Sequence, residues 1–300
     1  MAERKKMEGV FPILVTPFNE DSTIDEESLR RLIDFNIDAG VHGLGIALGS
    51  EVFKLTEAER DQLTRIVVNQ VAGRVPVVVN TGAAATDLAI FYSKMAEEAG
   101  ADGLLVLPAV SPAAPVSQEE VLGYFQAISN AVSIPIFIQD TNQATVPAPV
   151  ALRIAELCEQ VTYIKVESAP VMEKIAQMVK IAGHQLTVFG GAGGGFFIEE
   201  MRRGSVGTMP FATQPEVFVE IWNLCQKGDE EAAKEVYIRK LFPFSRVSAS
   251  GMFYEIQKEI LRQRGIIRTA KVRGPAPAMS ELTRRELQQV IDKVYPRGER

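Results

Sequence analysis

Short apolar runs alternate with amphipathic segments along most of this chain of 300 residues. The apolar runs are nearly continuous, whereas a strand with one solvent-exposed face would alternate apolar and polar residues. Continuous runs of this length are typical of strands in a parallel sheet that helices cover. The eight predicted strands are residues 10–15, 43–48, 75–80, 103–108, 134–139, 162–167, 186–191 and 206–211.

The segments between these strands carry start and stop signals for helices. Residues 56–59 and 117–120 match the capping box, in which two side chains three positions apart each bind the backbone of the other. Other helices are predicted to end at Gly40, Gly100 and Gly204, because glycine tolerates the positive φ of a helix end. Their recurrence indicates one strand–helix unit that repeats along the chain.

Eight strands that are each followed by a helix predict a closed (β/α)8 barrel over residues 1–224. An open, doubly wound sheet is the alternative, but it would favour a G-x-G-x-x-G turn after the first strand, and none follows it here. Residues 225–300 predict a C-terminal extension packed on the barrel. Its three expected helices are residues 228–242, 250–265 and 280–294.

Composition and charge exclude several classes of function. A net charge of −6 argues against a nucleic-acid binder and against an anionic membrane surface as partner. No apolar run approaches the roughly 20 residues of a membrane span, and the basic N-terminus lacks a cleavage site, so we expect no signal peptide. Cys158 and Cys225 are predicted to be reduced core thiols of a cytoplasmic protein. With His42 and His184 the only histidines, a zinc site or a histidine-based triad is disfavoured.

A lysine stands inside the predicted sixth strand, where its ammonium group is costly to bury. In this fold the active site lies at the carboxyl ends of the strands. Because side chains alternate along a strand, Lys165 and Glu167 are predicted to point together into the barrel mouth, with Val166 facing the helices. A desolvated lysine can attack a carbonyl group as a Schiff-base nucleophile. The spacing alone is equally compatible with a structural ion pair.

Two further segments follow predicted strands. Residues 190–195, "GGAGGG", resemble an anion-binding loop that opens the next helix, although a tight turn would also explain the glycines. Ser50 offers a hydroxyl donor after the second strand, and for Glu51 a structural hydrogen bond is favoured over catalysis. The charges of residues 199–203 are predicted to form a solvated helix face.

The order of motifs is similar to that of the dihydrodipicolinate synthase and N-acetylneuraminate lyase superfamily. The resemblance rests on "LVTPFNEDSTID", "GSEVFKLTEAER", "AGADGLLVLP", "YIKVES", "RRGSVGTM" and "RGIIRTAKVRGPAPAMSEL", and it covers nearly the whole chain. It implies a homotetramer without metal or organic cofactor, in which Lys165 forms an imine with pyruvate or another small 2-keto acid. It also implies that Gly49 and Ser50 hold the substrate carboxylate, and that Gly191 and Met209 line the mouth.

The departures from this superfamily indicate a different reaction from dihydrodipicolinate synthesis. Gln139 and Asp140 stand where the family carries its catalytic tyrosine, and Ala144 replaces an arginine that grips the second substrate. The threonine pair after strand two is absent as well. The remaining pattern resembles a subgroup that acts on 2-keto-3-deoxy sugar acids, similar to 2-keto-3-deoxy-L-arabonate dehydratase.

We therefore expect a lyase in which Lys165 forms the imine, Glu167 carries the proton and Gln139 orients a hydroxyl group. Dehydration and carbon–carbon cleavage stay open as the reaction. The alternatives are a pyruvate aldolase like 4-hydroxy-tetrahydrodipicolinate synthase, a non-catalytic keto-acid-binding homologue, or an unrelated phosphate-binding barrel that uses residues 190–195.

Overall fold

The computed structural model describes residues 6–111, 115–249 and 253–296. Its eight named strands pair in parallel in the order β1-β8-β7-β6-β5-β4-β3-β2. They are β1 (Gly9–Val10), β2 (Leu44–Ile46), β3 (Val77–Asn80), β4 (Gly103–Val106), β5 (Ile136–Asp140), β6 (Val161–Val166), β7 (Thr187–Gly193) and β8 (Gly207–Pro210). Each predicted run overlaps one strand, which confirms the predicted barrel.

The barrel closes beyond the end of β1. Ile13 forms parallel bridges with both Gly45 and Phe211, so it joins the two edges of the sheet. Its N–H donates to Pro210 O at 2.7 Å, and the N–H of Gly45 donates to Pro12 O at 2.9 Å. Pro12 has no N–H to donate, which interrupts the regular ladder inside the predicted first strand.

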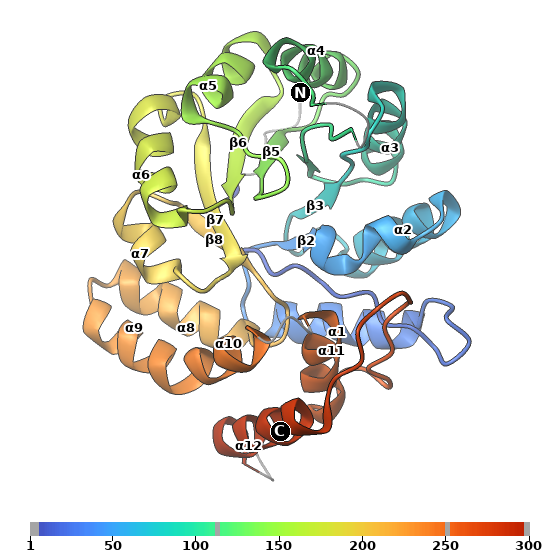
Figure 1. Ribbon diagram of the computed structural model, residues 1–300, viewed down its shortest axis with the longest axis vertical. Coiled ribbons are helices and arrows are strands. Elements are labelled where there is room, and N and C mark those ends of the chain that lie inside the picture. The colour runs from blue at the N-terminus through green and yellow to red at the C-terminus, as the bar shows by residue number, and fades with distance from the viewer. Residues whose placement is uncertain (1–5, 112–114, 250–252, 297–300) are drawn as a thin grey trace.

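Helices surround the strands, as Figure 1 shows. They are α1 (Glu26–Asp38), α2 (Glu57–Val71), α3 (Thr86–Glu98), α4 (Gln118–Ser129), α5 (Ala148–Leu157), α6 (Val171–Ala182), α7 (Phe197–Arg202) and α8 (Pro215–Gln226). Both predicted capping boxes are present, at the first residues of α2 and α4. Gly40, Gly100 and Gly204 have positive φ, as predicted.

Large side chains fill the barrel interior below its mouth. Phe137 and Tyr163 stack with their ring centroids 4.3 Å apart, and Phe189 packs edge-on against Phe137. Tyr163 precedes Lys165 by two positions on β6, so both side chains point to the same side of the sheet. The space available for a ligand therefore begins at the level of Lys165.

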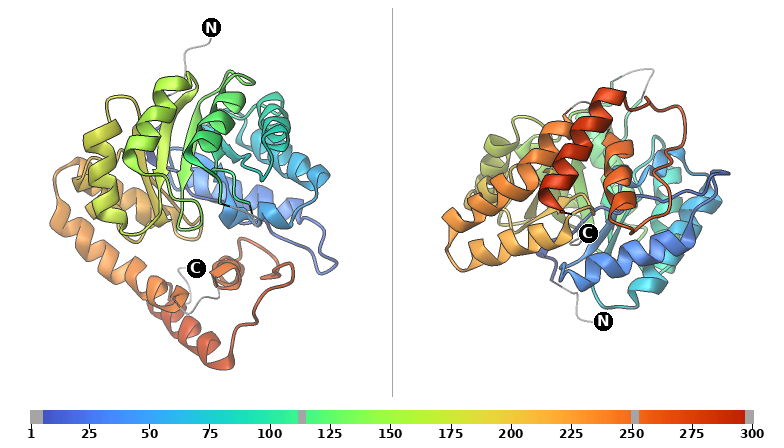
Figure 2. Two further views of the ribbon diagram at one scale, coloured as in Figure 1. Left: turned by 45° about the horizontal axis from the view of Figure 1, so that its top comes forward. Right: turned by 90° about the horizontal axis from the view of Figure 1, so that it is seen from below.

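The named elements after α8 are all helical. It contains α9 (Glu230–Val236), a π-helical turn (Tyr237–Leu241), α10 (Phe242–Ser248), α11 (Phe253–Gln263) and α12 (Glu281–Val294). The predicted helix over residues 228–242 therefore contains a π-helical turn, and residues 250–252 of the next one lie outside the described residues. The division after residue 224 stays a prediction, and it falls just before the end of α8. The left view of Figure 2 shows this tail below the barrel.

Ion pairs attach the tail to the first helices of the barrel. Arg268 contacts Asp25 at 2.6 Å, and Arg273 contacts Glu59 at 2.5 Å. The Arg273 guanidinium lowers the pKa of Glu59 to about 2. These pairs join residues more than 200 positions apart, so they determine where the tail lies over the barrel.

Two features of composition have structural counterparts. Cys158 and Cys225 are free thiols; the first is buried and the second is half-buried. Among the described residues, no helix is both long enough and apolar enough to cross a membrane.

Candidate active site

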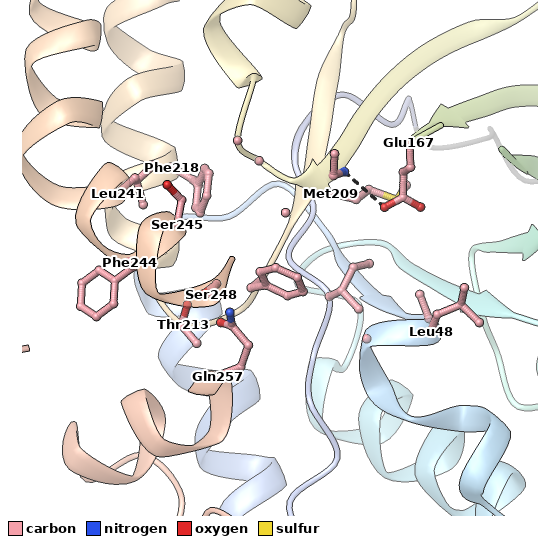
Figure 3. A pocket seen from close by; sticks show the side chains of 18 of the residues that line it. Leu48, Glu167, Met209, Thr213, Phe218, Leu241, Phe244, Ser245, Ser248 and Gln257 are labelled. Atoms are coloured by element: carbon pink, nitrogen blue, oxygen red, sulfur yellow. Dashed lines mark hydrogen bonds between the residues drawn. The ribbon is translucent and has the colours of Figure 1, made fainter. Parts of the chain in front are cut away.

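A cavity of about 710 Å³ lies between the barrel mouth and the tail. Gln139, Lys165, Glu167 and Met209 reach it from the carboxyl ends of the strands. Figure 3 shows Glu167 and Met209 entering from the barrel, while residues of the tail helices approach from the other side. The site is therefore built by both parts of the chain.

Lys165 and Glu167 form the only ion pair between charged side chains among the described residues that line this cavity. Lys165 Nζ lies 2.9 Å from Glu167 Oε1, and 3% of Lys165 is exposed. Val166, between them, is buried in the core between strands and helices. The alternation of β6 thus brings a nearly desolvated amine and a carboxylate together at the mouth.

Hydrogen bonds hold Glu167 in place from two sides. Gln139 Nε2 donates to Glu167 Oε2 at 3.0 Å, and the N–H of Ala192 donates to Oε1 at 3.3 Å. Asn80 Nδ2 donates to Gln139 Oε1 at 3.2 Å, which orients the Gln139 amide. Asn80 was not among the residues predicted for the site, although its position as the last residue of β3 was a usable signal.

Gly191 leaves the room that the Lys165–Glu167 pair occupies. A Cβ at this position would lie 2.6 Å from Glu167 Cγ and 2.7 Å from Lys165 Cε. Gly191 is therefore part of the wall behind the pair, and close approach explains why a glycine stands here.

The glycine-rich segment differs from the expected loop. Strand β7 continues to Gly193, and α7 begins only at Phe197. Positive φ angles at Ala192, Gly193 and Gly194 turn the chain over the last two residues of the strand and the residue that follows it. The segment does lead into the predicted helix, whose N-cap is Phe196, but four of its six residues, 190–193, belong to the strand and not to a loop.

Glu200 is completely buried, so the predicted solvated face over residues 199–203 is wrong at this position. Its carboxyl group packs behind β7, where a Cβ on Gly190 would collide with it. Burial, with a smaller contribution from the charge of Glu167, raises the pKa of Glu200 to about 8. A second acidic group therefore lies one strand behind the cavity.

The loop after β2 forms a short 3-10 turn over Leu48–Ser50. Leu48 and Gly49 line the cavity. Ser50 is 1% exposed, its hydroxyl donates to Leu14 O at 2.5 Å, and its N–H donates to Ala47 O at 2.9 Å. The structure thus brings Gly49 to the cavity and places the Ser50 side chain behind it.

Glu51 lies in a buried ion pair with the tail. Its Oε1 is 2.5 Å from Lys258 Nζ, and its Oε2 is 3.0 Å from Lys54 Nζ. Tyr254, one turn before Lys258 on α11, donates from its hydroxyl to Leu48 O at 3.2 Å. The favoured structural interpretation of Glu51 matches these contacts, but its partner 207 positions away could not be identified from local sequence.

Asp140 points away from the cavity into a separate polar cluster. It accepts hydrogen bonds from the Val146 N–H at 2.7 Å and from Lys174 Nζ at 2.5 Å. Gln139 and Asp140 therefore have different roles, since alternation sends one inward and the other outward. Within the described part of the chain, no three His, Cys, Asp or Glu side chains group closely enough to hold a metal ion.

Comparisons with known proteins agree with this geometry. The model of the Dihydrodipicolinate synthetase family matches residues 6–294. The chain is 29% identical over 296 residues to L-2-keto-3-deoxyarabonate dehydratase of Azospirillum brasilense, covering 96% of this chain and 94% of that protein. It is 31% identical over 294 residues to 4-hydroxy-tetrahydrodipicolinate synthase of Syntrophobacter fumaroxidans, covering 94% and 97%. The structure of dihydrodipicolinate synthase from Aquifex aeolicus matches with a TM-score of 0.89 at 27% identity, covering 96% and 98%.

Proposed function

This chain belongs to the dihydrodipicolinate synthetase family, and we propose that it is a Schiff-base-forming lyase that acts on a 2-keto-3-deoxy sugar acid. The observation that carries the proposal is the nearly buried Lys165 amine, 2.9 Å from the Glu167 carboxylate at the mouth of a barrel. The likeness to a 2-keto-3-deoxyarabonate dehydratase over almost the whole chain supports this class of substrate.

Imine formation needs an unprotonated amine. Glu167 Oε1 is within hydrogen-bond distance of Lys165 Nζ, so it can accept a proton from the ammonium group. The neutral amine then attacks the C2 keto carbon and forms a carbinolamine. Glu167 returns the proton to the hydroxyl of this intermediate, which leaves as water and generates the protonated imine.

The protonated imine draws electrons from C3. Glu167, again a carboxylate, removes a proton from C3, and an enamine forms. In a dehydration the enamine expels the C4 hydroxyl, which takes the proton from Glu167 and leaves as water. In a retro-aldol cleavage Glu167 would take the C4 hydroxyl proton instead, and the C3–C4 bond would break. Gln139, bonded to Glu167 Oε2, keeps the carboxylate aimed at these positions.

The substrate carboxylate is best accommodated by the backbone at Leu48 and Gly49. Both residues line the cavity, whereas the N–H of Ser50 already donates to Ala47 O. Met209 contributes an apolar side chain to the lining of the same cavity. The proposal therefore keeps Gly49 as a carboxylate site and assigns Ser50 to support of the turn.

Two positions favour this reaction over dihydrodipicolinate synthesis. Where the family resemblance implies a tyrosine for the proton relay, Gln139 faces the cavity and Asp140 is engaged with Lys174. Where it implies an arginine for the second substrate, Ala144 is buried. Proton transfer therefore falls to Glu167, which suits a reaction on one sugar acid better than a condensation of two substrates.

The family resemblance also supports a cytoplasmic homotetramer as the active form. Light scattering of the purified full chain tests this part: the proposal expects four times the mass of one chain. If the purified protein is a monomer and still turns over a sugar acid, the tetramer is not the required active form.

Trapping with borohydride tests the imine. Wild-type protein reduced in the presence of pyruvate should carry a covalent adduct on Lys165, and Lys165→Ala should carry none. Separate assays of water loss and pyruvate release over a panel of 2-keto-3-deoxy acids would then identify the reaction. If the wild type forms no adduct with any of these acids, the mechanism is wrong. Adduct formation without turnover of the whole panel would favour a non-catalytic binding protein.

A further inference from the structure

The cavity extends well beyond the imine-forming pair. Its volume of about 710 Å³ lies within the usual range for small-molecule sites, about 300–1,000 Å³. Pyruvate would leave much of it empty. The wall farthest from the strands comes from the tail, including Ser248 and Gln257, and Figure 3 shows Gln257 directed from α11 into this space.

On this wall, Gln257 carries a buried side-chain oxygen that has no hydrogen-bond partner among the described residues. It is 4% exposed, and its Oε1 accepts no hydrogen bond from the described residues. A buried acceptor without a donor is destabilising, and most buried polar groups in native proteins are paired. If the amide were rotated by half a turn, it would present an unpaired donor instead. In either orientation a hydrogen-bonding group faces the cavity.

Neighbouring contacts fix the position of Gln257. Tyr254 and Lys258 lie three positions before it and one position after it on α11. The first bonds Leu48 O at 3.2 Å, and the second forms the buried ion pair with Glu51. Both contacts join α11 to the loop after β2. Gln257 is therefore held at a constant distance from the proposed carboxylate site. A residue that recognises one particular group of a bound substrate needs such a fixed position.

The charges of the cavity define what Gln257 can recognise. Among the described residues that line it, Lys165 is the only cation and Glu167 the only anion. A phosphate or second carboxylate at the far end of a ligand would need a cation there, and the lining residues supply none. A hydroxyl group both donates and accepts, so it pairs with an amide in either orientation.

We propose that Gln257 is a specificity-determining residue that binds a hydroxyl group in the tail of an unphosphorylated sugar acid. This inference rests on the proposed function, because the acid must be anchored at Lys165 for its tail to reach α11. It goes beyond that function by selecting a neutral, hydroxylated tail and by assigning its recognition to the C-terminal helices. Thr213 and Ser248 add hydroxyl groups to the same wall.

A pair of ligands with equal carbon number tests this assignment. We would measure the half-saturating concentration for borohydride adduct formation with 2-keto-3-deoxy-L-arabonate and with 2-oxopentanoate, which lacks the tail hydroxyls. The variant Gln257→Met removes the amide and keeps a side chain of similar length and volume. We expect its half-saturating concentration to rise roughly tenfold to a hundredfold for the sugar acid and to stay unchanged for 2-oxopentanoate.

A matched variant and a folding readout complete the test. Gln263→Met makes the same substitution on the same helix, where Gln263 bonds Glu259 and Gln288, and it should leave the ratio between the two ligands unchanged. The melting temperature of Gln257→Met without ligand should equal or exceed that of the wild type, since an unpaired buried amide is removed. A lower melting temperature together with equal losses for both ligands would overturn the assignment.

The failure of this inference can be told apart from the failure of the proposed function. No adduct on wild-type Lys165 with either ligand would refute the function itself. If the wild type forms adducts and turns over the sugar acid, and Gln257→Met has the same half-saturating concentrations as the wild type, only the role of Gln257 is refuted. A terminal phosphate ester that binds better than the free sugar acid would overturn the inferred substrate class.

Discussion

Lys258 Nζ lies 2.5 Å from Glu51 Oε1, and both side chains are fully buried. This pair connects α11 of the tail to the loop that borders the cavity. Burial lowers the pKa of Lys258 to about 8, although the Glu51 carboxylate opposes this shift. A buried ion pair therefore joins the tail to the loop beside the site.

The first prediction concerns this pair. Lys258→Met leaves Glu51 buried with only Lys54 as its counter-ion, so the free energy of unfolding should fall by about 3–5 kcal/mol. Urea denaturation of the full chain measures this loss. Arg285→Met is the matched control, because the Arg285–Glu281 pair is exposed and should contribute no more than about 1 kcal/mol. Equal effects of the two substitutions would contradict the role of burial.

The second prediction separates imine formation from proton transfer. Glu167→Gln retains the shape of the side chain and the possible contacts with Lys165 and Gln139, but it cannot accept a proton. Borohydride adducts with pyruvate should still form, although more slowly, because water can carry the protons of imine formation. Turnover of the sugar acid should fall by about a hundredfold to ten-thousandfold, since the C3 proton needs a positioned base. Single-turnover kinetics with mass detection of the adduct would measure both steps. Unchanged turnover would remove Glu167 from the mechanism.

The third prediction tests the space behind the pair. Gly191→Ala places a methyl group within 2.7 Å of Lys165 Cε, so the pair must move, and kcat/KM should fall by about a hundredfold. Gly123→Ala is the control. Gly123 lies inside α4 with nothing within 4 Å of a Cβ, so this change should keep full activity and raise stability by about 0.5–1 kcal/mol. Normal activity of Gly191→Ala would contradict this prediction, because the neighbouring side chains would then accommodate the methyl group without loss of the active geometry.

The fourth prediction concerns pH. Burial raises the pKa of Glu200 from its ordinary 4.5 to about 8, so the folded protein binds this proton more tightly than the unfolded chain does. The stabilisation is complete below pH 4.5 and is lost as the pH rises through 8. The shift corresponds to at most about 5 kcal/mol.

Urea denaturation at pH 5 and pH 8.5 tests this linkage in the wild type and in Glu200→Gln. The uncharged variant lacks the group that titrates, so its free energy of unfolding should fall less between the two pH values. Glu167 and Glu199 also face this region and remain in both proteins, which makes the comparison specific to Glu200. Parallel pH profiles would mean that Glu200 is already charged in the folded state at pH 5.

Local sequence was sufficient for the barrel and for the centre of the site. Strand and helix signals act over a few residues, so apolar runs and capping boxes predicted the elements, and their number predicted the barrel. Alternation along one strand placed Lys165 and Glu167 on the same side, because their relation depends only on the backbone of β6. The same rule would have found Asn80, the last residue of its strand.

Long-range packing decided the surroundings of other residues that the sequence had pointed to. Ser50 looked like a substrate donor, but its hydroxyl is bonded to Leu14 O, and Glu200 looked solvated but is buried behind β7.

By itself, the sequence determined the order of elements, the parallel barrel and a lysine–glutamate pair at its mouth, since each follows from backbone geometry over short stretches. Only the tertiary structure decided that α11 borders the cavity and that Lys258 pairs with Glu51. It also decided that Gln257 Oε1, in the cavity wall, has no partner among the described residues. These relations join residues about 100 to 200 positions apart. Their contacts depend on how the tail packs across the barrel, and no local pattern specifies that packing.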